Sequence, residues 1–263
     1  MKTGLAAVTA VLLMAGAALA AEDVIVDVRN ERILVPVAFQ GEVAGAHGSI
    51  WRMELTGYND AGVHVKVALH GTCAILCPPP PAGGKSSFTL GMPSPGFGFG
   101  DADGIFYYVE RPHNREVHFS LRTRDLSRQA STWGTEIPVV REHDIPEGPV
   151  HLVDVPLLDG FRLTLRIYDL GPELNRTSEV VVRAFDRATD QLLFQSAVPI
   201  SMRGFPSTGL PTQVRLDDFG AQFGGFRGRA RIEVHPAGNA TRIWAFISIT
   251  HNETQHVTLV TPQ

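Results

Sequence analysis

The sequence predicts an all-β protein: two tandem antiparallel β-sandwich domains of the immunoglobulin-like kind, preceded by a signal peptide. Three observations support this fold class. Apolar and polar residues alternate in many short segments, one nine-residue pattern occurs twice, and the chain holds 26 Gly and 18 Pro in 263 residues. Helices favour Ala, Glu and Lys on their outer faces, so this composition indicates short strands joined by turns.

The repeated pattern is the clearest sign of strands. The segments that begin at Trp51 (WRMELTGYN) and at Phe161 (FRLTLRIYD) both read aromatic-Arg-x-x-Leu-x-x-Tyr-Asn/Asp. Their period of two is typical of a strand that has one face on an apolar core and the other on water. We therefore expect Trp51 and Phe161 to occupy equivalent core positions, with Arg52 and Arg162 on the outer faces.

A second sequence repeat supports duplication of one module. The segment FSLRTRDLS, which begins at Phe119, aligns with FISITHNET, which begins at Phe246, at a constant offset of 127 residues. Together the two repeats predict that the two domains are copies of one another.

The N-terminus predicts export. Residues 1–20 combine a basic start, a 15-residue apolar run from Leu5 to Leu19 and small residues that a signal peptidase accepts. This run is shorter than the roughly 20 residues of a membrane-spanning helix, and polar Glu22 and Asp23 follow it directly. We expect a mature protein outside the cytoplasm, secreted or periplasmic, with no membrane insertion after cleavage of the signal peptide.

The remaining chain divides at a polar segment that is rich in Pro and Gly, residues 142–149. We expect one β-sandwich domain over residues 21–145, a second over residues 146–263, and a hinge between them. The first domain contains a long irregular loop at residues 71–104. A hairpin is expected across the Asn59–Gly62 turn, joining the strands on either side of it.

A resemblance accompanies these patterns. Residues 35–59 read Val-Pro-Val, a Gly-rich loop, Gly-Ser-x-Trp-Arg-x-Glu-Leu and an Asn, and the chain closes with an aromatic strand, residues 251–254 (HNET) and a last short strand. In these features the chain resembles uncharacterised secreted bacterial proteins built of tandem immunoglobulin-like or fibronectin-like β-sandwich modules. The resemblance implies a fold and an extracytoplasmic setting, and it implies no catalytic residue.

Cys73 and Cys77 are the only cysteines. In an exported protein, two cysteines four residues apart in an irregular loop favour a disulfide. The alternative is a metal site, because His70 precedes them and blue-copper centres use His and Cys ligands on β-sandwiches. Four prolines at residues 78–81 occupy the positions where a further ligand would follow, so we expect the disulfide and no metal or cofactor.

Four aromatic residues are candidate ligand contacts: Phe97, Phe99, Tyr107 and Trp133. Exposed aromatic rings offer a large contact area at low entropic cost, and carbohydrate-binding modules use them in this way. The alternative is that the aromatic residues of this region only fill the core and plug one end of a sandwich.

Composition and motifs favour a binding protein over an enzyme. A net charge of −4 provides no basic surface for nucleic acid. The chain contains neither His-Glu-x-x-His nor Gly-x-Ser-x-Gly. We expect an exported non-enzymatic module at the cell surface or in the periplasm, for binding, adhesion or structure, with a protein or glycan partner and no catalytic residue. The alternatives are a carbohydrate-binding protein that uses the exposed aromatics and a metal-dependent enzyme with its site in the loop at 71–104.

Overall fold

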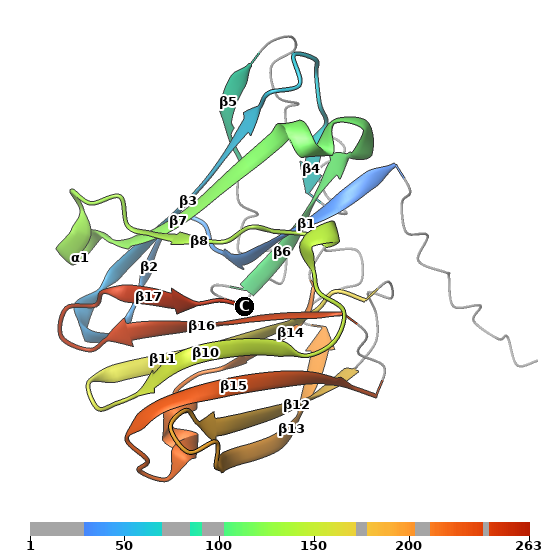
Figure 1. Cartoon of the computed structure of the whole chain (residues 1–263). Coiled ribbons are helices and arrows are strands. Elements are labelled where there is room, and N and C mark those ends of the chain that lie inside the picture. Colours follow the sequence, from blue (N-terminus) through green and yellow to red (C-terminus); the bar gives the residue numbers. More distant parts are fainter. Residues whose placement is uncertain (1–28, 70–84, 91–102, 172–177, 203–210, 239–241) are drawn as a thin grey trace, which may run out of the picture.

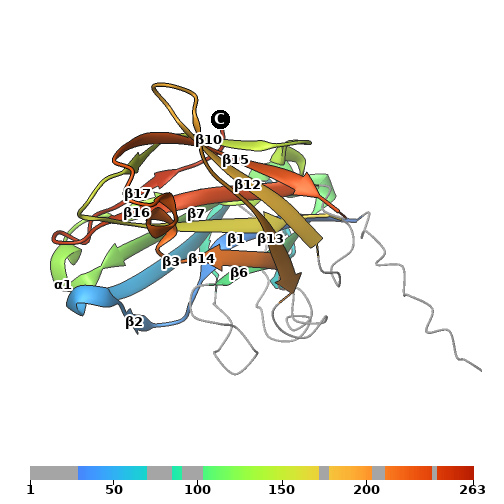
Figure 2. The same ribbon diagram turned by 90° about the horizontal axis from the view of Figure 1, so that it is seen from below.

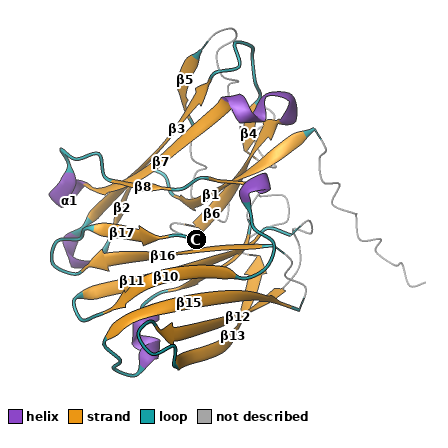
Figure 3. Cartoon of the chain, in the orientation of Figure 1, coloured by secondary structure: helices purple, strands orange, loops and turns teal. Residues whose placement is uncertain are grey.

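The computed structural model consists mostly of strands, and every strand pairing is antiparallel, which confirms the all-β fold class (Figure 1). Helices are limited to short turns at the edges of the sheets (Figure 3). The structure describes residues 29–69, 85–90, 103–171, 178–202, 211–238 and 242–263. The predicted signal peptide and most of the loop at 71–104 lie outside these residues.

We use "first half" for the chain up to residue 141 and "second half" for the chain from residue 150. The first half contains β1 (Asn30–Ala38), β2 (Glu42–Ala44), β3 (Ile50–Asn59), β4 (Val67–Leu69), β5 (Ser86–Thr89), β6 (Asp103–Glu110), β7 (Val117–Asp125), α1 (Leu126–Gln129), β8 (Thr135–Ile137) and β9 (Val140–Arg141). The second half contains β10 (Val150–Leu157), β11 (Phe161–Asp169), β12 (Ser178–Asp186), β13 (Leu192–Met202), β14 (Thr212–Leu216), β15 (Gly228–Ala237), β16 (Ile243–His251) and β17 (Val257–Val260). Short 3-10 helices are η1 (Ala46–Gly48), η3 (Arg111–Glu116), η4 (Glu142–Asp144) and η6 (Phe219–Phe223).

In the part of the chain that the structure describes, the strands of each half pair only with strands of the same half. In the first half one sheet has the order β4-β6-β1-β9, and the other has the order β2-β3-β7-β8 with β5 also paired to β3. The second half forms one sheet with the order β10-β15-β12-β13-β14-β11-β16-β17. Its long strand β13 pairs with β12 over most of its length and with β14 at its end (Figure 2). The sheet bends there, so that β10 comes into contact with β16 and β17.

The two halves repeat one scheme of strand pairing. The neighbours β4-β6-β1 and β5-β3-β7-β8 of the first half correspond to β12-β15-β10 and β14-β11-β16-β17 of the second half. Corresponding strands also follow one another in the same order along the chain. This order differs from that of an immunoglobulin domain, whose first two strands lie in one sheet, because β1 and β3 lie in different sheets.

The hairpin that was expected across Asn59–Gly62 is wrong. Strand β4 pairs with β6 in the other sheet and does not pair with β3. The side chain of Asn59 explains the change of direction, because its Nδ2 donates to the carbonyl of Val63 at 2.8 Å and its Oδ1 accepts from the amide of Ala61 at 3.0 Å. These bonds hold a local turn that carries the chain from one sheet to the other.

The register of the strands supports the first repeat, 51–59 with 161–169, and corrects the alignment of the second, 119–127 with 246–254. The first repeat has an offset of 110 residues, so Gly57 of β3 corresponds to Ile167 of β11. Across the sheet, Gly57 pairs with Phe119 and Ile167 pairs with Ala245. Phe119 therefore corresponds to Ala245, an offset of 126 and not 127. A slip of one residue moves a side chain to the other face of a strand. Accordingly, Ala245 packs in the core of the second half, whereas Phe246 packs on the core of the first.

Two apolar cores are present among the described residues, and the first extends across both halves. It combines strands of the first half with Tyr168, Trp244 and Phe246 of the second half. Tyr168 is completely buried, and its hydroxyl donates to the carbonyl of Pro36. The prediction that the polar face of residues 161–169 meets water is therefore wrong, because the first half covers that face.

Close packing at this contact also requires a glycine. A Cβ atom at Gly104 would lie 2.6 Å from the ring of Tyr168, which is closer than any real side-chain contact. The amide of Gly104 donates to Oε1 of Gln213 at 2.8 Å. The contact between the halves is thus both apolar and hydrogen-bonded.

Candidate functional site

A cavity of about 480 Å³ lies where the two halves meet, and we call it the seam cavity. Its volume falls within the range of about 300–1,000 Å³ that is usual for small-molecule sites. The outer face of β11, β14, β16 and β17 forms its floor, and the ends of β1, β2, β3, β7 and β8 form its roof. The lining residues of the floor are Arg162, Thr164, Arg166, Arg215, Asp217, Asp218, Phe246, Ser248, Thr250, Val257 and Leu259, and those of the roof are Val37, Phe39, Val43, Gly45, Ala46, Trp51, Thr123 and Ile137.

Three arginines give the floor its charge. Arg166 on β11 and Arg215 on β14 are direct cross-strand neighbours, and Arg162 lies four residues before Arg166 on the same face of β11. Like charges in directly opposed positions of a sheet destabilise it. Arg215 is balanced by Asp217, whose Oδ2 lies 3.1 Å from its Nε. Among the described residues, the other two arginines have no such ion pair with a carboxylate.

Arg166 is held mainly by neutral partners. Its Nη1 donates to Oγ of Ser248 at 3.2 Å, and its guanidinium lies over the ring of Phe246 at 5.7 Å from the ring centre. Its Nε is buried and has no hydrogen-bond acceptor. Burial lowers the pKa of Arg166 and the charge of Arg215 acts in the same direction, and together they outweigh Tyr168, Asp217 and Asp103, which raise it. The protein therefore places a cation where its charge is unfavourable.

Arg162 shows the same deficit. Its Nη2 donates to Oε1 of Gln255 at 2.8 Å, and its Nη1 is buried without an acceptor. Within the described part of the chain, neither Arg162 nor Arg166 forms an ion pair with a carboxylate. Buried charge is costly unless it is paired, so both guanidiniums carry an unpaired charge at the wall of the cavity.

The roof is apolar and includes one of the repeated aromatic residues. Trp51 is half-buried and not fully buried as expected, because the cavity exposes part of its ring. The indole packs closely on the chain at Gly45, where a Cβ atom would lie 2.4 Å from its Nε1. The corresponding Phe161 is also half-buried and packs edge-on against His251, with ring centres 5.1 Å apart.

Arg52 and Arg162 were both expected on outer faces, but the structure places them in different surroundings. Arg52 lies on the exposed face of β3, where it pairs with Glu42. Arg162 lies in the seam cavity, because the first half covers the corresponding face of β11.

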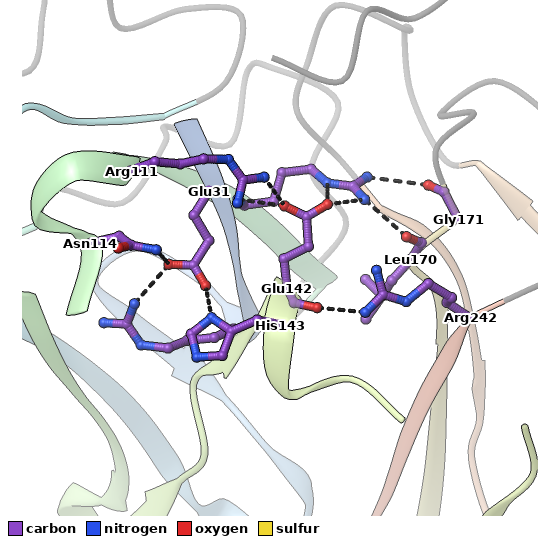
Figure 4. Close-up of polar contacts among 10 residues, drawn as sticks. Glu31, Arg111, Asn114, Glu142, His143, Leu170, Gly171 and Arg242 are labelled. Carbon is purple, nitrogen blue, oxygen red and sulfur yellow. Dashed lines mark hydrogen bonds and ion pairs between the residues drawn. The ribbon is translucent and has the colours of Figure 1, made fainter. Parts of the chain in front are cut away.

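A polar network fixes the two halves that form the cavity (Figure 4). We call it the linker clamp; its residues are Glu31, Arg32, Arg111, Asn114, Arg141, Glu142, His143 and Arg242. Glu142 pairs with Arg32 at 2.8 Å and with Arg111 at 3.2 Å. Arg32 also donates to the carbonyls of Leu170 and Gly171 at 3.0 and 3.2 Å, which belong to the second half.

Glu31 anchors the other side of the clamp. It is completely buried and accepts hydrogen bonds from Asn114 and Arg141, both at 2.8 Å, while its second oxygen contacts Nδ1 of His143. From the second half, Arg242 donates to the main-chain carbonyl of Glu142 at 2.7 Å. The segment that the sequence indicates as a hinge is therefore bonded to both halves.

The pKa of Glu142 reflects these contacts. Burial by itself raises the pKa of this carboxyl, but the charge and hydrogen bonds of Arg32, together with the charge of Arg111, outweigh burial and lower it. Glu142 is therefore ionised and bound to cations at neutral pH.

The aromatic residues singled out in the sequence do not come together. Tyr107 is 0% exposed in the core of the first half, so it cannot contact a ligand at the surface, and this expectation is corrected. Trp133 is 83% exposed, with the guanidinium of Arg122 at 5.0 Å from its ring centre. Four other candidates, Phe97, Phe99, Cys73 and Cys77, lie outside the described residues.

The described residues contain no group of three or more His, Cys, Asp or Glu that could hold a metal ion. No helix in the same part of the chain has the length and apolar character needed to cross a membrane. Comparisons of the chain with models of protein families, with curated proteins and with solved structures found no match.

Proposed function

We propose that this protein is an exported, non-enzymatic binding module of two tandem β-sandwiches, and that the seam cavity is its binding site for an organic anion. One observation carries the proposal: Arg162 and Arg166 line the cavity with buried donors and have no carboxylate partner among the described residues. The shared scheme of strand pairing supports two copies of one sandwich, although their strand order is not that of an immunoglobulin domain.

An anion in the cavity would offset the energetic cost of burying the unpaired guanidiniums of Arg162 and Arg166. Hydrogen bonds to charged groups contribute about 1.5–3 kcal/mol each, more than those between neutral groups. A guanidinium also matches a carboxylate geometrically, because two parallel N–H donors meet two oxygens. The buried donors of the floor are therefore placed to supply both affinity and orientation.

The lining favours binding over catalysis. Ser248 is a potential nucleophile in the cavity, but its Oγ accepts from the cation Arg166, and the described lining residues include no His, Lys or Cys to activate it. Asp217 is engaged by Arg215. These groups hold a ligand more readily than they transform one.

The export part of the proposal depends on the signal peptide predicted at residues 1–20. An extracytoplasmic setting also agrees with the predicted disulfide between Cys73 and Cys77, which intact mass before and after reduction and alkylation would detect. Labelling of both thiols without a reductant would contradict the disulfide.

Glycan binding is a second candidate function, and Trp133 favours it. Its ring is almost fully exposed and Arg122 lies against it, which leaves a flat aromatic surface beside a cation. Replacing Trp133 with Ala should abolish binding to a glycan array if this surface is the glycan site, and unchanged array binding would exclude it.

The anion site is tested by isothermal titration of the mature protein with carboxylates and sulfate. The variant Arg166→Met should lose at least about tenfold in affinity, the effect of one charged hydrogen bond. Arg183→Gln is the matched control, because Arg183 lies on β12 away from the cavity and bonds Gln195. Equal affinities of wild type and Arg166→Met would contradict the proposed site.

A further inference from the structure

We infer that the ligand of the seam cavity is an amphipathic monoanion, an acyl or aryl carboxylate, and not an acidic saccharide. This inference rests on the proposed function and narrows its ligand class. The carboxylate lies on the arginine floor between Arg162 and Arg166, and the apolar body lies against the roof.

Polarity is divided between the two walls of the cavity. Every charged side chain of the lining belongs to the floor. Among the described residues of the roof, the only side-chain hydroxyl is that of Thr123, which donates to the carbonyl of Arg52 at 3.5 Å. The rest of the roof is aliphatic or aromatic, with Phe39, Val43 and Trp51 among its members.

This division does not suit a saccharide. A sugar carries hydroxyls around its whole ring, and each hydroxyl that is buried without a partner lowers affinity. The hydroxyl of Thr164 already donates to Asp217 at 3.4 Å, and the hydroxyl oxygen of Ser248 already accepts from Arg166. A chain or ring of carbon with one carboxylate leaves no such group unpaired.

The floor also carries apolar side chains beside its charged ones. Phe246 lies under the guanidinium of Arg166, and Val257 and Leu259 of β17 lie on the same face of the sheet. An apolar body that follows this wall is removed from water while its head remains on the arginines. Affinity should therefore increase with the length of the body.

A homologous series tests the inference by isothermal titration of the mature protein. Acetate, butanoate and hexanoate should bind with affinities that rise about fourfold for each added methylene. Hexanoate should exceed hexan-1-ol, which lacks the charge, and glucuronate, which lacks the apolar body, each by at least about tenfold.

Two variants assign the two ends of the ligand. Val43→Asn, at the half-buried residue of the otherwise exposed strand β2, should lower the affinity for hexanoate by about fourfold or more and leave that for acetate unchanged. Arg166→Met should lower both. Thermal melting of each variant establishes that it is folded, and acetate binding by Val43→Asn shows directly that its floor is intact.

The outcomes separate the inference from the function on which it rests. If glucuronate binds as well as hexanoate, or affinity does not depend on chain length, the amphipathic ligand is wrong while the anion site stands. If neither the carboxylates nor sulfate bind, the anion site itself is wrong and the inference falls with it.

Discussion

Arg166 is the residue whose surroundings depart most from those of an ordinary surface arginine. It lies beside Arg215, its Nε has no acceptor, and its strongest contacts are a hydroxyl and an aromatic ring. Its charge therefore contributes little to folding. In the proposed complex, a bound anion offsets this cost.

The variant Arg166→Met should therefore be as stable as the wild type, or more stable by about 1 kcal/mol. Replacing a poorly compensated buried charge with a side chain of similar volume is often neutral or stabilising. Urea unfolding without ligand measures the difference. A loss above about 2 kcal/mol would show that the guanidinium supports the fold and is not reserved for a ligand.

Asp125 represents the opposite case, a buried charge that is fully used. Its carboxylate accepts from the amides of Ile50 and Ser127 at 2.9 and 3.0 Å and pairs with Arg128 at 3.0 Å. Burial by itself raises the pKa of Asp125, but these bonds outweigh burial and lower it. The residue caps α1 and joins it to β3.

Asp125→Ala should cost about 2–4 kcal/mol, since it removes a helix cap and leaves the amide of Ile50 without a partner. The matched control is Asp186→Ala, because Asp186 bonds Ala188 and Thr189 in the same way at the surface. The control should cost less than about 1 kcal/mol. Urea unfolding compares the two variants, and equal losses would contradict the role of burial.

At the scale of elements, β3 and β11 show how far the sequence predicts this fold. The period of two identifies both strands and their inner faces, and Leu55 and Leu165 are buried as expected. The polar residues of β11 indicate an exposed face, yet the first half covers that face. Periodicity describes one strand and carries no information on what packs against it.

A signal for this contact is nevertheless present in the sequence. Trp244 and Phe246 lie on the face of β16 that is opposite to its own core, and Tyr168 lies on the same side of β11. Apolar residues on both faces of a strand, as in β16, indicate that both faces are buried. The arginines of the cavity carry no comparable signal, because an alternating arginine is ordinary on an exposed strand.

The strand β3 offers a comparison of its two ends. Leu55→Ala should cost about 2–5 kcal/mol, as is usual for a fully buried leucine. Trp51→Ala should cost less than Leu55→Ala despite its greater size, because Trp51 is half-buried and lines the cavity. Chemical denaturation measures both. A larger loss for Trp51→Ala would restore the core position that the repeat predicts.

At the scale of the whole molecule, the linker clamp turns the expected hinge into a rigid contact. Residues 142–149 have the composition of a linker, but Glu142 is bonded to arginines of the first half, and Arg242 of the second half donates to its carbonyl. Together with the shared core, this favours one cooperative unfolding transition. Limited proteolysis should accordingly spare this segment, and two stable halves after cleavage there would contradict the clamp.

Acid should weaken the clamp. The folded-state pKa of Glu142 is lowered, so its contribution to stability is present above its unfolded pKa of about 4.3 and is lost as the pH falls through the folded value. Glu142→Gln should cost about 3 kcal/mol at pH 7. The difference from the wild type should disappear once the pH is below the folded pKa. A difference in stability that is independent of pH would show that the charge of Glu142 does not contribute to the stability of the fold.

The central claim is that the junction of the two halves is an anion site, and a crystal structure with 6-bromohexanoate tests it most directly. The anomalous signal of bromine marks the end of the apolar body, and the electron density shows the carboxylate. We predict one bromine peak beside the roof of the seam cavity, near Trp51, with the carboxylate on Arg162 and Arg166. A bromine peak elsewhere on the protein, with an unaltered cavity, would contradict the claim.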